Sequence, residues 1–277
     1  MAVLKMNEIL RNDIQEYLDG SESVLIKTIT DLTSKFTKGT ERVTIPKVSG
    51  LALRDVPTGG TAQTAGGMTQ TGDELICDQK KEVPEYIEYG DDQDSALRME
   101  DAFLSAAPRV FAEGMESEIA TGLNTSAYND STADDHEFNS GTANSFGIED
   151  IAKAKKLLDK AKVPKKDRYL AVNADGMEIL ASMSEFQEGQ KALNDEALRQ
   201  GVVSLVKGFK VVQSEDVASD KVLCYHKSAL AFAVHDSVKY IKQEIANEGR
   251  TFLSLRGKYG AKQLDGGRRN VVITMAA

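Results

Sequence analysis

The sequence predicts an α+β fold in which two limbs extend from a mixed body, and three observations predict it. Apolar residues at a three- to four-residue spacing mark helices in the first forty residues and again over 94–123. Two alternating runs, 42–48 and 74–89, flank a long stretch rich in Gly and Thr. The closely spaced strands expected after residue 200 lack the regular β–α alternation of a doubly wound sheet.

Residues 1–40 are interpreted as an N-terminal arm. Residues 2–19 form an amphipathic helix with the apolar face Met6, Ile9, Leu10, Ile14, Tyr17 and Leu18. Gly20 ends this helix, and Ser21 or Ser23 caps a second one. The face of the second helix is Leu25, Ile29, Leu32 and Phe36. Both stripes are too narrow for fully buried helices, so we expect the arm to lie against the body of its own chain or that of a neighbour.

Residues 41–90 are expected to form one long hairpin. Its first strand is 42–48, where Pro46 suits a sheet edge, and its second extended run is 74–89. Between them, residues 57–73 are small, rich in Gly and Thr, and uncharged until the last residue. Such a stretch is uncommon inside a compact domain unless it is functional or disordered. We therefore predict a mobile tip that reaches away from the core.

The longest predicted helix lies in the segment 91–146. Asp94 and Ser95 are suitable N-caps, and Pro108 is expected to kink the helix because it removes a hydrogen bond from the interior. At ~1.5 Å per residue the helix is a rod of ~45 Å. Its apolar stripe is Leu97, Phe103, Leu104, Ala107, Phe111, Met115, Ile119 and Leu123. Residues 124–147 form a polar loop dense in Asn, Asp, Ser and Thr.

The rest of the chain mixes helices and strands. A helix begins at Ile148 and ends before Pro164, a buried strand follows at 168–173, and another helix covers 174–183. Further strands are predicted at 201–206, 208–213, 221–225, 228–235, 237–245, 250–256 and 269–275. The pattern is α+β, with antiparallel strands towards the end of the chain.

Composition argues against nucleic-acid binding, membrane insertion and export. A formal net charge of −9 disfavours an open basic surface that grips nucleic acid. The longest apolar stretches, such as 228–234, are too short to span a bilayer, and the charged, amphipathic first residues are unlike a signal peptide. Cys77 and Cys224 lie in unrelated segments, so we expect two reduced, inert thiols in a cytoplasmic product.

The motifs that carry catalysis or cofactors are absent. The chain has no G-x-S-x-G elbow, phosphate-binding P-loop, H-E-x-x-H or paired C-x-x-C, so no catalytic residue, metal or cofactor is predicted. The best metal candidate is Asp130, Asp134, Asp135, His136 and Glu137. It fails the EF-hand pattern, because Asp135 and Gly141 occupy the sixth and twelfth positions where Gly and Glu are needed. A cytoplasmic α+β hydrolase with carboxylate chemistry stays open as the alternative of another class.

The order of these parts resembles the major capsid proteins of tailed phages, which share the Hong Kong 97-type fold. Residues 163–173, V-P-K-K-D-R-Y-L-A-V-N, with the helix behind them, resemble a recurrent segment of the family's axial domain. Residues 207–214, K-G-F-K-V-V-Q-S, resemble the strand pair that follows it. The runs A-L-A-F-A at 229–233 and Y-G-A-K at 259–262 are similar to the family's closing pattern.

The resemblance implies an architecture in the family's terms. Residues 1–40 are the N-arm, 41–90 the extended E-loop hairpin, and 91–146 the spine helix and polar loop of the peripheral domain. Residues 147–228 are mainly the axial domain, and 229–277 return to the peripheral domain. Assembly contacts are expected from both limbs, at Ile9, Tyr17, Leu25, Ile29, Gly59, Thr61, Gln63, Met68 and Thr71.

The resemblance also implies a function and partners. The chain is expected to assemble with copies of itself, in hexamers and pentamers, into an icosahedral shell around a tailed phage's double-stranded DNA, without sequence-specific binding and without a membrane. It belongs to the virion and is made in the cytoplasm of the bacterial host. A separate scaffolding protein, a portal and, as an optional addition, a decoration protein are the other expected partners. An encapsulin-like nanocompartment shell is the alternative within the same fold.

Overall fold

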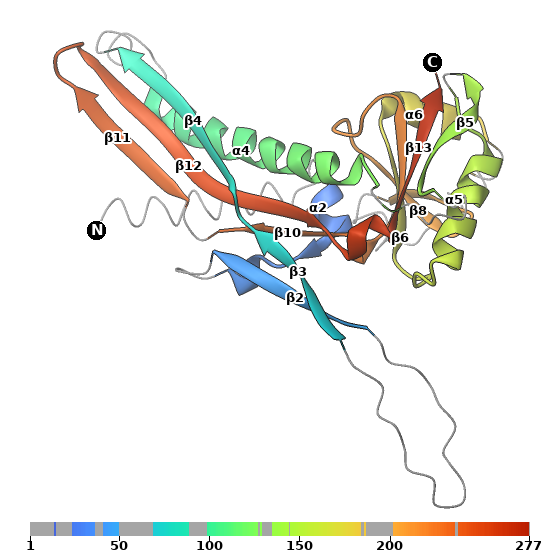
Figure 1. Cartoon of the computed structure of the whole chain (residues 1–277). Helices are drawn as coiled ribbons and strands as arrows, with labels where there is room; N and C mark the ends of the chain where they lie inside the picture. Colours follow the sequence, from blue (N-terminus) through green and yellow to red (C-terminus); the bar gives the residue numbers. More distant parts are fainter. Residues whose placement is uncertain are drawn as a thin grey trace, which may run out of the picture.

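A computed structural model of the chain describes residues 14, 24–36, 41–49, 69–88, 99–126, 128, 135–143, 145–183, 186, 202–235 and 238–276. Figure 1 shows an elongated molecule with a two-layer arm of sheet and helix at one end and an α/β module at the other. A hairpin projects from the region between them. The predicted α+β class is confirmed, since two mixed sheets and their helices form the body.

The first sheet is built around one long strand. Its members are β1 (Thr30–Asp31), β4 (Gln79–Glu88), β10 (Leu230–Val234), β11 (Lys239–Ile245) and β12 (Arg250–Gln263). Strand β12 pairs antiparallel with β4 along one edge, and with β11 and then β10 along the other. It therefore extends beyond the predicted end at 256, because its last part, from Tyr259, continues the ladder onto β10.

Helix α4 (Met99–Leu123) covers one face of this sheet. Its buried side chains include Ala107, Phe111, Met115, Ile119 and Leu123, which confirms the predicted stripe over these positions. Gly257 of β12 allows the close approach, because a Cβ there would lie 2.4 Å from the ring of Phe111. The helix continues through Pro108 without interruption, and the predicted caps at 94 and 95 lie outside the described residues.

The second sheet has six strands in the order β5–β13–β9–β6–β8–β7. Their bounds are β5 (Glu137–Ala143), β6 (Arg168–Val172), β7 (Val202–Val206), β8 (Phe209–Gln213), β9 (Lys221–His226) and β13 (Asn270–Ala276). Helices α5 (Ile148–Lys160) and α6 (Ala174–Ala181) bury apolar side chains in the core of this sheet. The predicted helix–strand–helix order over 148–183 is confirmed, and Asn173 caps α6 by accepting the N–H of Gly176 at 2.9 Å.

Two predicted placements are wrong. The expected polar loop 124–147 contains strand β5, which pairs parallel with β13. Phe138 is the only large apolar side chain of β5, so this edge strand carries little of the alternation that marks a strand. Strand β13 itself pairs with β9 and β5 in the second sheet, so only β10, β11 and β12 of the closing strands return to the sheet of α4.

Residues 24–36 do not form the predicted second helix. A single turn, α2 (Leu25–Thr28), is followed by β1, which pairs parallel with β10, and by the 3-10 turn η1 (Thr33–Lys35). The β-branched residues at 28–30 favour extended backbone, and β10 offers a strand edge to pair with. Asp31 then fixes the next turn, since its carboxylate accepts the backbone N–H of Thr33 at 2.8 Å.

Candidate assembly surfaces

The projecting hairpin is the first candidate surface. Strands β2 (Arg42–Ser49) and β3 (Thr69–Ile76) pair antiparallel along their whole length, from Arg42 with Ile76 to Ser49 with Thr69. Among the described residues they form a two-stranded sheet of their own, and most of their side chains are exposed. A hairpin of two strands is at best marginally stable alone in water, so it gains stability from any further surface that covers it.

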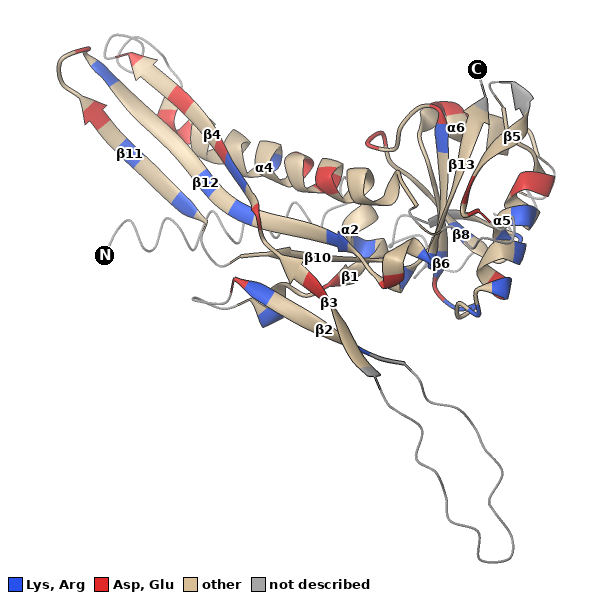
Figure 2. Ribbon diagram, viewed as in Figure 1, with Lys and Arg blue, Asp and Glu red and all other residues tan. Residues whose placement is uncertain are grey.

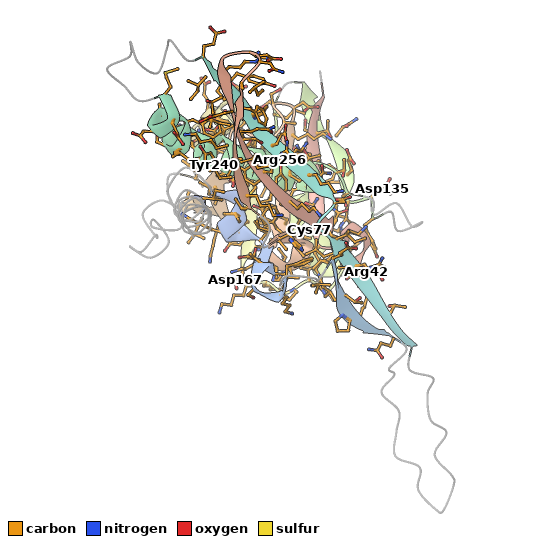
Figure 3. All side chains as sticks on the ribbon, turned by 90° about the vertical axis from the view of Figure 1, so that its left-hand side faces the viewer. Arg42, Cys77, Asp135, Asp167, Tyr240 and Arg256 are labelled. Atoms are coloured by element: carbon orange, nitrogen blue, oxygen red, sulfur yellow. The ribbon has the colours of Figure 1, made fainter. Side chains whose placement is uncertain are left out.

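The root of the hairpin is fixed to the body. The small core beneath it comprises Leu32, Phe36, Leu75, Cys77, Ala231, Ala233 and Leu264. Asp73 accepts the backbone N–H of Asp265 at 2.9 Å, and Lys47 forms an ion pair with the Asp265 carboxylate. Asp265 begins the turn η3 (Asp265–Gly267) between β12 and β13. Figure 3 shows Cys77 within the body and Arg42 at the start of the projecting part. The hairpin therefore leaves the body in a set direction.

The second candidate surface, called the basic groove below, lies on the face of the first sheet that α4 leaves uncovered. It is a hollow of about 440 Å³ lined by Lys80, Lys81, Glu82, Lys239, Arg256, Gly257 and Lys258. Strand pairing sets Lys80 opposite Lys258, and both Glu82 and Lys239 opposite Arg256. Figure 2 shows blue segments on β4, β11 and β12 in this part of the first sheet. In the described part of the chain, Arg256 pairs with Glu82 at 2.5 Å, whereas the four lysines have no carboxylate partner.

The third candidate surface, called the acidic patch below, comprises Glu113 of α4 with Glu215 and Asp216 of the loop between β8 and β9. Burial raises the pKa of Asp216 above its ordinary value, and the charges of Glu113 and Glu215 raise it further. Glu113 forms an ion pair with Arg109 at 3.1 Å. The fold thus holds three carboxylates close together beside one arginine.

A comparison with family models decides what kind of protein presents these surfaces. The model described as phage capsid protein matches residues 37–274. The chain belongs to this family of phage capsid proteins. No curated protein matches the sequence. The capsid protein is therefore a structural subunit of a phage capsid and a component of the virion.

Solved structures agree with the fold of the capsid protein. One from Mycobacterium phage Che8 aligns with a TM-score of 0.69 at 22% identity over 90% of each chain. The capsid of cyanophage P-SCSP1u gives 0.68 at 16% identity, over 90% of this chain and 86% of that one. The capsid of a native GTA particle gives 0.65 at 10% identity, over 93% and 91%. These likenesses confirm the Hong Kong 97-type fold, and no finding supports the nanocompartment or the hydrolase.

The structure places the predicted assembly residues of the capsid protein in different surroundings. Leu25 and Ile29 are 0% and 2% exposed and lie in the core with α4, so they contact their own chain and their prediction as assembly residues is corrected. Ile14 is buried in the same core, so the described part of the arm finds its burial within the chain. Thr71 is exposed on β3, opposite Lys47. Ile9, Tyr17, Gly59, Thr61, Gln63 and Met68 lie outside the described residues.

A buried carboxylate that the sequence analysis missed holds the N-terminal segment of the capsid protein. Glu116 of α4 accepts the backbone N–H of Leu25 at 2.5 Å. Burial raises the pKa of Glu116 to about 7, although backbone hydrogen bonds from Leu25, Val24 and Ile26 act in the opposite direction. The sequence did carry a signal for its burial. Glu116 directly follows Met115 and precedes Ile119 by three residues, so helical spacing puts it on the buried face of α4.

The metal candidate and the two cysteines of the capsid protein can be placed in part within its described residues. No group of three or more His, Cys, Asp or Glu side chains there is arranged to hold a metal ion. Of the rejected metal candidate, His136 is buried and its Nδ1 lies 3.0 Å from the backbone oxygen of Asn270, whereas Asp130 and Asp134 are not described. Cys77 and Cys224 are free and buried, and burial raises the pKa of Cys77 to about 11. None of the described helices has the length and hydropathy needed to cross a bilayer.

Proposed function

We propose that this capsid protein assembles with copies of itself, as hexamers and pentamers, into an icosahedral shell that encloses the double-stranded DNA of a tailed phage. The observation that carries the proposal is the hairpin β2–β3, which leaves the body and exposes most of its described side chains. Such a limb buries surface on a neighbour that a compact body does not reach. Contacts of ~3 kcal/mol are too weak to hold a free pair, but several per subunit sum to a durable lattice.

In this proposal the parts keep the family's names with two additions. Residues 1–40 are the N-arm and 41–90 the E-loop, whose exposed Thr71 and undescribed residues Gly59, Thr61, Gln63 and Met68 contact a neighbour. Helix α4 is the spine of the peripheral domain. The second sheet with α5 and α6 is the axial domain, to which β5 and β13 are added because they pair there. The remaining limb residues Ile9 and Tyr17 are proposed contacts of the N-arm.

The shell requires partners beyond the chain itself. We propose a separate scaffolding protein during assembly, a portal at one vertex and, where the phage has one, a decoration protein on the outside. Production takes place in the cytoplasm of the bacterial host. Enclosed DNA is held without sequence-specific contacts, and a formal net charge of −9 also opposes tight binding through additive phosphate contacts. The free subunit is therefore expected to show negligible retention on double-stranded DNA at physiological salt, and tight retention would contradict this part of the proposal.

The assembly role is tested with a variant that shortens the hairpin and keeps its register. Ser49 and Thr69 are strand partners, so an Asn-Gly pair in place of residues 50–68 closes the hairpin with a two-residue turn. Wild-type protein, expressed with and without its neighbouring genes, should form closed shells or capsomers in negative-stain images. The shortened variant should keep the wild-type circular dichroism and melting temperature and lose closed shells. A wild-type chain that stays a monomer or dimer under all these conditions contradicts the proposal.

A further inference from the structure

The basic groove gathers more positive charge than its surroundings compensate. Lys80, Lys239 and Lys258 share one face of the sheet with Arg256, whereas Lys81 lies opposite Gly257 on the face toward α4. Glu82, the carboxylate among the lining residues, is already paired with Arg256. Lys80 and Lys258 face each other across paired strands, a position in which like charges destabilise a sheet. A chain with a formal net charge of −9 has more carboxylates than cations, yet none of the described carboxylates forms an ion pair with these lysines. The described part of the groove is therefore complementary to an anionic surface.

The acidic patch has the opposite imbalance. Glu215 and Asp216 directly precede Val217, which packs in the same core as Ala112 and Met115 of α4, and this places them beside Glu113. Arg109 pairs with Glu113 at 3.1 Å. Cationic side chains from outside would relieve the repulsion among these carboxylates. The patch and the groove thus each lack the kind of charge that the other presents.

The two surfaces cannot meet within one molecule, because the first sheet and α4 lie between them. The groove lies on the open face of the first sheet, whereas Gly257 packs against Phe111 of α4 on the covered face. Glu113 follows Phe111 by two residues, about 200° around the helix, and is exposed on the far side of α4. We propose that the basic groove of one subunit receives the acidic patch of a neighbouring copy.

This inference rests on the proposed assembly function and specifies one of its contacts. A contact between two different surfaces of identical subunits is heterologous, and it generates a ring when the rotation between neighbours closes. Hexamers and pentamers are rings of this kind. A docked copy also presents its carboxylates at fixed positions, which suits a hollow of about 440 Å³. Nucleic-acid phosphates are the other anion that this chemistry fits, and the experiment distinguishes them.

Charge reversal tests the contact from each side. A groove variant carries Lys80→Glu with Lys258→Glu, and a patch variant carries Glu113→Lys with Asp216→Lys. All four side chains lie at exposed or half-buried positions, so both variants should keep the wild-type circular dichroism spectrum. Each variant alone should lower the assembled fraction, measured by sedimentation velocity and negative-stain imaging, by about tenfold or more near the critical concentration. Raised ionic strength should weaken wild-type assembly in the same direction.

Rescue of assembly by compensating substitutions is the decisive test. A chain that carries all four substitutions again sets opposite charges against each other and should assemble to within about threefold of wild type. An equimolar mixture of the groove and patch variants should also recover six-membered rings, because in alternation the two reversed surfaces face each other and so do the two unchanged ones. Five-membered rings cannot alternate and should not recover in the mixture. Failure of both the combined chain and the mixture, with all variants folded, overturns the inference.

A matched control variant and a DNA-binding measurement separate a contact between subunits from phosphate binding. Lys156→Glu with Lys165→Glu makes the same change in net charge at two exposed positions away from the groove, and it should assemble like wild type. Binding of the groove variant and of wild type to a labelled double-stranded oligonucleotide is measured by anisotropy at low and physiological salt. Loss of DNA binding in the groove variant with unchanged assembly overturns the inference in favour of phosphate binding. If wild type never assembles, the proposed function has failed before this contact is reached.

Discussion

The carboxylate of Glu116 on α4 accepts the backbone N–H of Leu25 at 2.5 Å, and so joins the long helix to the N-terminal segment. Its second oxygen, Oε2, is buried and has no partner among the described residues. A neutral carboxylic acid suits this site better than a carboxylate, because an ionised oxygen without water or a donor is strongly disfavoured in a protein interior. Burial accordingly raises the pKa of Glu116 to about 7.

This site predicts a stability that depends on pH and on Glu116. The folded protein keeps a proton that the unfolded chain releases at its ordinary pKa of 4.5, so stability falls as pH rises from about 4.5 to about 7 and is level above that range. The contribution is about 3 kcal/mol. Glu116→Gln keeps the acceptor for Leu25 and does not titrate. In urea unfolding at several pH values, wild type should lose this stability relative to the variant as pH rises. If the unfolding free energies of the two proteins change with pH in parallel, the pKa of Glu116 is not raised and this account is contradicted.

Asn270 links the end of α4 to the second sheet, and the stability of this junction should depend on its neutral amide. Its Nδ2 donates to the backbone oxygens of Leu123 at 2.7 Å and Thr125 at 3.0 Å. Asn270→Asp replaces both donated bonds with a buried carboxylate facing two carbonyl oxygens, so we expect a loss of at least about 3 kcal/mol by chemical denaturation. Asn139→Asp, at an exposed position of β5, should change stability by less than about 0.5 kcal/mol. Equal effects would refute the proposed role.

Arg168 organises the turn after α5 through a fork that lysine cannot reproduce. Its side chain is 2% exposed and donates to the oxygens of Pro164 at 2.8 Å and Val163 at 2.7 Å, and to Asp159 at 2.7 Å. Arg168→Lys should cost about 2–3 kcal/mol of unfolding free energy, since one ammonium group does not reach all three acceptors. Arg42→Lys, in an exposed pair with Glu74, should cost less than about 1 kcal/mol. An Arg168→Lys variant with the same melting temperature as wild type would rule this account out.

Gly260 is predicted to be intolerant of any side chain. A Cβ there would lie 2.2 Å from the backbone oxygen of Ile76, at the point where β3 crosses β12. Backbone atoms do not yield as a flexible side chain does, so Gly260→Ala should destabilise the protein by about 1–3 kcal/mol and loosen the hairpin root. Gly141→Ala, with no atom within 4 Å of its Cβ position, is the control and should be neutral or slightly stabilising. Limited proteolysis at the hairpin root and denaturant melts check both variants, and comparable behaviour of the two would contradict the prediction.

The sequence was informative where one face of an element is continuously apolar. The stripe of α4 from Ala107 to Leu123 and the strand–helix pair over 168–183 needed only local periodicity, and the structure confirms both. The order of these parts also carried the family resemblance. Local patterns were sufficient there because burial on one face of an element leaves a regular spacing in the chain.

Periodicity failed where a partner distant in the sequence decides the local structure. The segment from Leu25 to Phe36 has helical spacing, but the free edge of β10 draws its middle into a strand. Strand β5 is recognisable only from its neighbour β13. Neither the basic groove nor the acidic patch leaves a local signal, because strands far apart in the sequence bring Lys80 beside Lys258, and a loop brings Asp216 beside Glu113.

The turn η3 has a mechanical consequence for a molecule of this shape. Asp265 holds two residues of the hairpin, and the turn it begins connects the last strand of one sheet to the last strand of the other. Tension on the hairpin therefore reaches the body by two routes, along the chain from β3 into β4 and through Asp265 into the turn between β12 and β13. Because β4 continues from β3 (Figure 1), its hydrogen bonds to β12 resist in shear and share the force, instead of opening one after another.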